Sequence, residues 1–352
     1  MVRISRRILF GLAAGGAMAG FGRRAEAEDL LPHEKELHEA AKREGEITWY
    51  TGQMQAEPSE AVGRAFAARY PGVKVNVVRS SSQVTFQRLA QDMRAGVSQC
   101  DVFSSTDYSH ASYLKREGRL MQYRPQNAAK LIPVAREAAD PDGLFQITYL
   151  GLYLMARNNN AVTEADAPKG WKDLLDPKWR GKIAVGHPGY SGAITSWCLM
   201  MQKMYGWDYF KQLERNNPLI GRSSGDPVTA LNAGERSIGA AIPSATTLLS
   251  ISRGNPITLI YPTDGTLMVP SPTGALAKAP HPNAAKLFME FVTSPAYHQA
   301  TREFFGESLR PEVPPPPGAQ PLDKILMITP TPEEVESGGQ EVKELWRDTF
   351  GV

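Results

Sequence analysis

Short hydrophobic runs alternate with helix-like segments along the first third of the chain. The runs Ile47–Tyr50, Val73–Val78 and Asp101–Phe103 have strand length and predict three strands. Between them, hydrophobic residues recur every three to four positions, and turn residues such as Pro71-Gly72 end each segment, as expected for helices. The first helix is predicted at Pro32–Glu44. Three successive strand–loop–helix units favour a parallel sheet with helices on its faces, which is an α/β fold.

One long β-rich run, Phe145–Arg157, interrupts this alternation in the middle of the chain. It exceeds an ordinary strand in length and is long enough to cross from one lobe to another. The alternation then resumes. Strands are predicted at Lys182–Val185, Ser237–Ile242 and Ile257–Tyr261, and amphipathic helices from Pro282 and over Glu333–Asp348. A length of 352 residues fits two domains, or two lobes of one.

The first 27 residues have the pattern of a cleaved export signal. Ser5-Arg6-Arg7 precedes the apolar run Ile8–Phe21, and the small-x-small sequence Ala25-Glu26-Ala27 follows. The adjacent arginines favour the twin-arginine route. The alternative is a membrane anchor, but the apolar run is shorter than the roughly 20 residues that cross a bilayer. We therefore expect a signal peptide at residues 1–27 and a periplasmic mature protein.

The net charge and the cysteine content bear on two questions: whether the protein binds nucleic acid and whether it contains a disulfide. Without residues 1–27, which carry five arginines and one glutamate, the net charge of +2 becomes −2. This near-neutral balance gives no electrostatic reason to expect nucleic acid as a partner. The two cysteines, Cys100 and Cys198, lie in segments assigned to different lobes, where a disulfide would block relative motion. They are expected to be buried, unpaired residues.

Several loops that follow predicted strands are rich in serine, threonine and glycine, and each leads into a helix. Ligands of open α/β sheets bind at the carboxyl ends of the strands, and helix N-termini with free N–H groups suit anions. Each loop taken alone is equally explained as an ordinary helix cap. Arg79 and Arg222 flank two loops and would be either counter-charges or surface residues. The candidate ligand-binding residues are Gln53, Ser81, Ser82, Ser105, Thr106, Tyr190, Ser191, Gly192, Arg222, Ser244, Thr246 and Thr247.

Enzymatic and metal-binding patterns receive little support. The six histidines form no H-E-x-x-H or cysteine-rich metal motif, and neither a Walker A sequence nor a strand-linked G-x-G-x-x-G is present. We expect no catalytic residues, no metal site and no cofactor. A hydrolase that uses a cleft serine stays open as an alternative, and it would require a histidine beside that serine.

Four sequence stretches resemble the iron(III)-type extracellular solute-binding proteins of bacterial ABC importers. These stretches are Asp101-Val102-Phe103 with Leu114–Leu120, Asp173–Ala184, Tyr261–Thr266 and Ala279–Phe288. The resemblance covers roughly residues 45–300. It implies a type II periplasmic-binding fold, in which two α/β lobes are joined by crossing strands and close on a ligand. Those strands would lie near Phe145–Leu154 and Ile257–Pro262. Lobe 1 would then comprise residues 28–147 and 262–300, and lobe 2 residues 148–261 and 301–352.

The resemblance also implies a partner, an ABC permease in the inner membrane, and a monomeric protein that does no chemistry on its ligand. Iron-binding members carry paired tyrosines after the strand that matches Ser237–Ile242, whereas Pro243–Thr247 contains none. Related members bind phosphonates or sugar phosphates. We therefore expect a small organic anion as ligand: a phosphonate, a phosphate ester or a carboxylate. Two alternatives remain: ferric iron bound through Tyr50, Tyr153 or Tyr190, and service to a sensor instead of a permease.

Overall fold

The computed structural model describes residues 30–97 and 99–352, and the predicted signal peptide at residues 1–27 lies outside them. Within the described residues, helices and strands alternate as the hydrophobic pattern predicts. The resulting fold is mixed α/β, with two lobes that share one sheet of ten strands.

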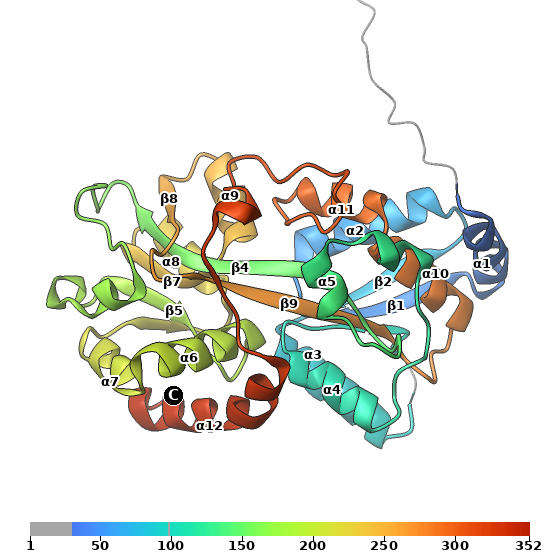
Figure 1. Ribbon diagram of the computed structural model, residues 1–352, viewed down its shortest axis with the longest axis horizontal. Coiled ribbons are helices and arrows are strands. Elements are labelled where there is room, and N and C mark those ends of the chain that lie inside the picture. The colour runs from blue at the N-terminus through green and yellow to red at the C-terminus, as the bar shows by residue number, and fades with distance from the viewer. Residues whose placement is uncertain (1–29, 98) are drawn as a thin grey trace, which may run out of the picture. The chain divides into compact units, whose positions relative to one another are not determined.

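The first lobe is built from the N-terminal third of the chain and from two later helices. Its sheet has helices on both faces (Figure 1). The elements are α1 (Pro32–Glu44), β1 (Glu46–Thr51), α2 (Ala56–Arg69), β2 (Lys74–Arg79), α3 (Ser82–Arg94), β3 (Val102–Ser104), α4 (Tyr108–Arg116), α5 (Pro133–Glu137), α10 (Pro282–Val292) and α11 (Pro295–Arg302), with a 3₁₀ turn at Gln126–Lys130.

Local sequence explains these boundaries. α1 is predicted to the residue: it begins at Pro32, the Glu34 carboxylate accepts the Leu31 N–H at 2.8 Å, and Gly45 ends the helix with a φ of 77°. Alternation in β1 places successive side chains on opposite faces. Trp49 packs its ring against Phe288 of α10, and Tyr50 lies among the hydrophobic residues of α3 and α4.

The second lobe repeats the same architecture. It contains β5 (Ile183–Gly186), α6 (Gly192–Tyr205), α7 (Asp208–Arg215), β6 (Leu219–Gly221), α8 (Asp226–Asn232), β7 (Ile238–Pro243), α9 (Ser244–Ser252) and β8 (Ile257–Ile260), with 3₁₀ turns at Trp171–Leu175 and Pro177–Trp179. The strands β5, β6 and β7 run parallel. The C-terminal segment adds a 3₁₀ turn at Leu322–Lys324, β10 (Met327–Ile328) and α12 (Pro332–Phe350), which packs on α6 and α7 and also contacts α4.

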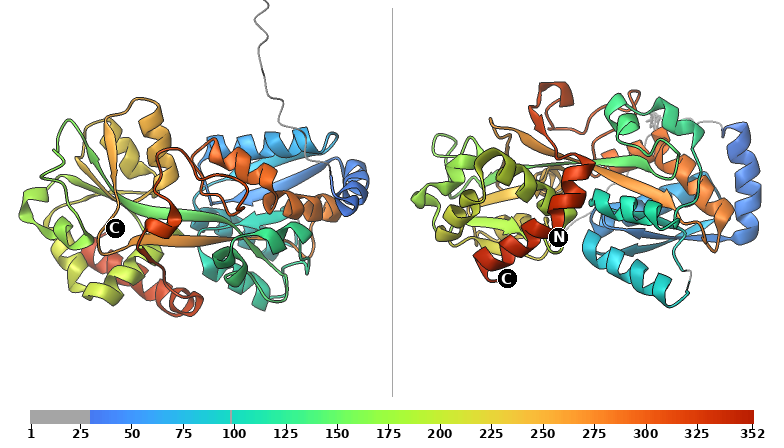
Figure 2. Two further views of the ribbon diagram at one scale, coloured as in Figure 1. Left: turned by 45° about the horizontal axis from the view of Figure 1, so that its top comes forward. Right: turned by 60° about the horizontal axis from the view of Figure 1, so that its bottom comes forward.

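Two long antiparallel strands connect the lobes: β4 (Gln146–Asn158) and β9 (Thr266–Ala275). The sheet order is β2-β1-β3-β9-β4-β7-β5-β6, with β10 beside β9 and β8 beside β4. β9 pairs with β3 at its C-terminal end, and β4 pairs with β7 at its own. Figures 1 and 2 show these two strands running between the lobes from three directions.

The first crossing strand was predicted correctly and the second was not. The predicted segment Ile257–Pro262 contains β8, which pairs with Met155–Asn158 at the far end of β4 and stays within the second lobe. The crossing strand is β9. It contains Pro270 and Pro272, which lack the N–H that a central strand normally donates, and this removes the usual strand signal from the sequence.

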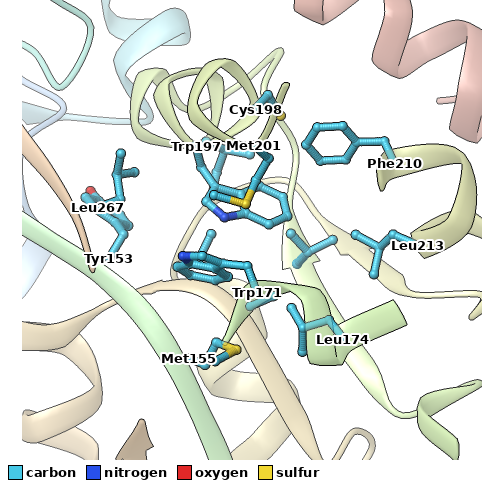
Figure 3. Close-up of a cluster of buried hydrophobic side chains, with 14 of the residues drawn as sticks. Tyr153, Met155, Trp171, Leu174, Trp197, Cys198, Met201, Phe210, Leu213 and Leu267 are labelled. Atoms are coloured by element: carbon cyan, nitrogen blue, oxygen red, sulfur yellow. The ribbon is translucent and has the colours of Figure 1, made fainter. Parts of the chain in front are cut away.

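The core of the second lobe accounts for two of the stretches that resemble solute-binding proteins. It contains Leu174, Trp179 and Ile183 of the stretch Asp173–Ala184 and is hydrogen-bonded to the stretch Tyr261–Thr266. Trp171 and Trp197 lie at its centre, with ring centroids 5.6 Å apart (Figure 3). The Trp171 indole donates to the Gly265 carbonyl at 2.8 Å, and its backbone N–H donates to Asp264. These stretches therefore join the core to the loop before β9. Cys198 lies in this cluster and Cys100 in the first lobe; both are buried and free, as expected.

Candidate functional site

A cavity lies between the two lobes, where the parallel strands of both end. It encloses about 800 Å³ including its open mouth. Loops after six strands line it, together with the middle of β4 and the turn after α11. The lining residues are Gly52, Gln53, Met54, Gln55, Pro58, Arg79, Ser81, Ser82, Thr106, Tyr149, Gly151, Leu152, Tyr153, Ser191, Ser223, Ser224, Pro243, Ser244, Ala245, Thr246, Leu249, Thr301, Phe304 and Gly306.

The structure brings seven of the twelve predicted residues to this cavity, and all seven come from loops or helix starts at strand ends. Their position follows from the fold, because the carboxyl ends of parallel strands gather at one edge of each sheet. The seven are Gln53, Ser81, Ser82, Thr106, Ser191, Ser244 and Thr246.

The other five predicted residues do not line it. Ser105 is fully buried and hydrogen-bonds the His110 ring at 2.8 Å. Thr247 donates to the Pro243 carbonyl of its own helix turn at 2.9 Å. Tyr190 is 38% exposed with its ring edge against His187, and Arg222 is exposed. Gly192 lies in the contact between the lobes.

Three helices begin at the cavity wall without a side-chain cap. Ser81 precedes α3 and Ser191 precedes α6, and neither hydroxyl accepts a bond from its helix. α9 begins at Ser244 after Pro243, which has no capping group. The first N–H groups of a helix have no partner within it and carry partial positive charge. Three such ends on one cavity create a site for a negatively charged group.

Arg79 is the one charged side chain among the described residues that line the cavity. Its Nε donates to the Met54 carbonyl at 2.9 Å, and it forms no other hydrogen bond or ion pair in residues 30–97 and 99–352. Burial lowers the pKa of its guanidinium, but the group stays cationic at neutral pH. Two of its nitrogens are therefore available to a ligand. From the sequence, Arg222 was predicted as a ligand-binding residue and Arg79 was not; the structure instead places Arg79 on the cavity wall and leaves Arg222 outside it.

Gln53 is fixed by a group of buried hydroxyls on the crossing strands. Its amide nitrogen donates to Thr273 Oγ1 at 2.9 Å and to Thr148 Oγ1 at 3.2 Å, and these two hydroxyls are 2.7 Å apart. Ser82 and Thr106 hydrogen-bond each other from neighbouring loops of the first lobe. Side chains from five parts of the chain are thus held in position by one another.

Two phenols line the cavity, and the sequence identified one of them. Tyr149 and Tyr153 both come from β4. Burial raises the pKa of Tyr153 to about 12 and also raises that of Tyr149, so both are neutral at pH 7. Tyr50 and Tyr190, the two other proposed phenolates, do not line the cavity; Tyr50 is buried and donates to Asp92 at 2.9 Å. The described residues hold no cluster of three or more histidine, cysteine or acidic side chains placed to bind a metal.

The lobes touch where α4 meets α6. A Cβ added to Gly192 would lie 2.4 Å from Asp107 Cβ and 2.7 Å from its Cα. Asp107 caps α4 and is held by Ser109 and by Gln83 Nε2, which donates at 2.6 Å; Lys343 Nζ of α12 lies 3.9 Å from the same carboxylate. Burial favours the neutral acid, but neighbouring charges and these hydrogen bonds hold the pKa of Asp107 below its usual range.

A second bridge between the lobes joins Arg253 to Glu57 at 2.6 Å. Arg253 follows α9 in the second lobe, and Glu57 lies in the first turn of α2 in the first. The Gly192–Asp107 contact and this bridge therefore both join the two lobes beside the cavity.

The cavity serines lack the partner that a hydrolase requires. Gly221–Gly225 has the G-x-S-x-G spacing typical of a nucleophilic serine, in a strand–turn–helix context. Ser223 of this stretch donates to Asp226 at 2.6 Å. Among the described residues no histidine hydrogen-bonds a serine of the cavity wall. The Ser105–His110 pair is buried outside it.

The residues that the sequence did not indicate come mainly from two places. Tyr149, Gly151 and Leu152 lie on the crossing strand β4, and Thr301, Phe304 and Gly306 lie at the end of α11. Neither segment has the serine- and threonine-rich composition that marked the other loops. The length of the Phe145–Arg157 run was the one signal that placed β4 near the cleft.

Residues 47–305 match the family model of the bacterial extracellular solute-binding proteins. This match spans both lobes, both crossing strands and nearly all of the cavity wall. The chain belongs to this family. Solute-binding proteins of ABC importers bind small ligands and interact with a permease, and the family is one of binding proteins, not of enzymes.

This solute-binding protein has relatives among curated sequences. It is 23% identical over 287 residues to a putative 2-aminoethylphosphonate-binding periplasmic protein of Salmonella paratyphi A, a span of 77% of each chain. It is 24% identical over 243 residues to an uncharacterized protein of Haemophilus influenzae, which covers 67% of this chain and 69% of the relative.

Solved structures show the same fold. The periplasmic binding protein AfuA of Actinobacillus pleuropneumoniae, bound to fructose-6-phosphate, matches with a TM-score of 0.78 and 23% identity, over 87% of this chain and 98% of AfuA. Iron-bound HitA of Pseudomonas aeruginosa matches with a TM-score of 0.74 and 22% identity, over 86% and 99%. The solute-binding protein therefore has the type II periplasmic-binding fold that the sequence predicted. None of its described helices combines the length and apolar character needed to cross a bilayer.

Proposed function

We propose that this protein is the periplasmic component of an ABC importer and captures a small organic anion in the cavity between its lobes. The candidate ligands are phosphonates, phosphate esters and carboxylates. The observation that supports this function is the convergence of three uncapped helix N-termini and one arginine on a cavity with no acidic lining residue.

The charge of the wall favours an anion over a cation. Arg79 carries a full positive charge, and the starts of α3, α6 and α9 add partial positive charge from their free N–H groups. The serine and threonine hydroxyls of the same loops donate hydrogen bonds to anionic oxygens. A ferric ion at this place would meet like charge from Arg79 and two neutral phenols.

The relatives agree with this choice. The Salmonella protein is named for a phosphonate and AfuA was solved with a sugar phosphate, and both ligands are small organic anions. HitA was solved with iron, so its fold by itself fits both kinds of ligand. The residues that line the cavity of this chain are what favour an organic anion over ferric iron.

Calorimetry on the mature protein, unfolded and refolded to remove carried-over ligand, tests the proposal. The panel is ethylphosphonate, 2-aminoethylphosphonate, fructose-6-phosphate, propionate and ferric citrate. We expect at least one phosphonate, phosphate ester or carboxylate to bind and to raise the melting temperature. Binding of ferric iron with none of the anions would refute the proposal.

Arg79→Met and Arg222→Met form a matched pair. Both remove a cation beside a serine-rich loop that was predicted to bind the ligand, but only Arg79 lines the cavity. A hydrogen bond to a charged group contributes about 1.5–3 kcal/mol, so the Arg79 variant should bind its anion roughly 10- to 150-fold more weakly. The Arg222 variant should bind like the wild type. Equal losses in both would mean that Arg79 does not contact the anion.

A further inference from the structure

Three apolar side chains line the cavity apart from its serine- and threonine-rich loops. They are Pro58 in the first turn of α2, Leu249 in α9 and Phe304 in the turn after α11. Pro58 is buried, whereas Leu249 and Phe304 are half-buried. The Phe304 ring contacts no other aromatic ring in residues 30–97 and 99–352. Apolar and aromatic side chains usually supply most of the contact surface for the organic part of a ligand, so these three residues bear on what that part is.

The three side chains lie at the same end of the cavity. Arg253 follows Leu249 by four residues, so the two share a face of α9. Arg253 pairs with Glu57 at 2.6 Å, and Glu57 directly precedes Pro58. Leu249 therefore faces the first turn of α2. The helix α11 packs on α2 as well, which brings Phe304 to this end from the other side (Figure 1).

The helix α9 links this apolar end to the anion site. It begins at Ser244, where its uncapped N–H groups face the cavity, and both Ala245 and Leu249, one turn apart, line the wall. A helix rises about 1.5 Å per residue, so Leu249 lies about 7–8 Å along the axis from Ser244. A ligand whose anionic group binds at the start of α9 therefore reaches the apolar end with an organic body of about that length.

The wall at this end does not suit a polar body. Among the described residues that line the cavity there is no aspartate or glutamate, so an ammonium group would lack a counter-charge. The side chains of Pro58, Leu249 and Phe304 neither donate nor accept hydrogen bonds, and a polyol buried against them would lose its bonds to water without replacement. A hydrocarbon body gains affinity from the same burial, and an aromatic one can also pack against the free ring of Phe304.

From this we infer that the ligand is an arylalkyl anion, a phosphonate, phosphate ester or carboxylate whose aromatic ring packs among Pro58, Leu249 and Phe304. This assignment rests on the proposed function. A ring joined to the acidic group through a two-carbon chain has the length that α9 sets. Leu249 and Phe304 are then the residues that determine specificity, whereas Arg79 and the helix starts bind the acidic group of every ligand alike.

Matched ligand pairs on the mature protein test this assignment by calorimetry. The pairs differ only by the ring: 2-phenylethylphosphonate and ethylphosphonate, 2-phenylethyl phosphate and ethyl phosphate, 3-phenylpropionate and propionate. Burying each CH₂-sized group raises affinity roughly fourfold. For the anion class that binds, we therefore expect the ring-bearing ligand to bind roughly 30-fold or more tightly than its partner, since half of the ring is enough to give this factor.

Phe304→Ala and Leu249→Ala should each reduce this preference about fivefold or more and leave the affinity for the ring-free ligand within about threefold of wild type. Two variants on different segments keep the test valid if one of them fails to fold, which melting temperatures check. Tyr113→Ala is the control, because Tyr113 is an exposed aromatic residue of α4 that does not line the cavity, and it should behave as the wild type.

Three results would overturn the inference and leave the anion site intact. The first is equal affinity within every pair in the wild type. The second is tighter binding of 2-aminoethylphosphonate or fructose-6-phosphate than of the ring-bearing ligand of the same anion class. The third is equal weakening of both members of a pair in the folded variants. Failure of all the anions to bind would instead refute the proposed function, and the inference with it.

Discussion

Gly192 offers the sharpest test of how the lobes close. It is the first residue of α6, and its backbone requires no positive φ, so alanine is conformationally acceptable there. The added Cβ would nevertheless lie 2.4 Å from Asp107 Cβ, whereas carbon atoms in contact need roughly 3.5 Å. Asp107 is held by Gln83 and Ser109 and has little freedom to move away. The lobes of Gly192→Ala must therefore stay apart by about 1 Å at this contact.

The added methyl group raises the free energy of the conformation in which residue 192 and Asp107 are in contact. Overpacking by one methyl group typically costs about 1–3 kcal/mol. At about 1.4 kcal/mol per tenfold change, the dissociation constant of the anion should rise roughly 5- to 150-fold. The free protein can open to relieve the clash, so its melting temperature should change little. Calorimetry and thermal melts together measure both quantities.

Gly339→Ala is the matched control. Gly339 is buried in α12, where an added Cβ would meet Thr195 at an ordinary 3.6 Å. It should bind like the wild type. An affinity for Gly192→Ala within threefold of wild type, with an unchanged melting temperature, would refute the idea that the Gly192–Asp107 contact belongs to the bound state.

Two further predictions concern charged groups. Lys343→Met removes the cation that lies 3.9 Å from Asp107. A partly exposed ion pair contributes about 0.5–1 kcal/mol, so ligand dissociation should become about two- to fivefold faster in stopped-flow measurements. Lys203→Met is the control, because the pair of Lys203 with Glu334 joins α6 to α12 within the second lobe and its loss should leave the dissociation rate unchanged. The second concerns Glu307, whose pKa burial raises to about 7 from an ordinary 4.5. Because the ionised carboxylate is less stable in the folded than in the unfolded protein, Glu307 lowers the free energy of unfolding as it ionises. This effect is absent below pH 4.5 and grows as the pH rises to 7, reaching roughly 3 kcal/mol at about 1.4 kcal/mol per pKa unit. Glu307→Gln should therefore melt above the wild type at pH 8 and together with it at pH 4.5, and a constant difference across this range would contradict the assigned burial.

The alternation of helices and strands could be predicted because local signals mark nearly every boundary in the first lobe. Gly45 and Pro71-Gly72 end helices for reasons internal to their own segments. β9 could not be predicted in this way. It is a strand because it pairs with β4 and β3 on its two sides, and its two prolines hide that role from any local pattern.

The candidate site was predictable to a similar extent. Serines at strand ends reach the cavity because their loops open onto it. Gly192 and Thr247 have the same local composition, but one packs on Asp107 and the other bonds its own helix turn. The same limit applies to the two arginines, because the sequence predicted Arg222 as a ligand-binding residue and not Arg79, which lines the cavity. Glu307 gave no signal at all, because nothing in its local sequence indicates that its carboxyl is buried without a hydrogen-bond partner. The ligand-binding roles of the cavity residues stay predictions.

The prolines of β9 have a mechanical consequence. Pro270 lies opposite Leu150 and Pro272 opposite Ile147, within the stretch where β4 and β9 pass between the lobes. Neither proline has an N–H to donate, and the pairing of β4 with β9 is irregular between Ile147 and Tyr149. The ribbon that joins the lobes is therefore interrupted close to the first lobe, where Thr273 pairs with both Gln146 and Ser104. We expect this part of the two strands to act as the hinge when the lobes open and close, while each lobe moves as a rigid body.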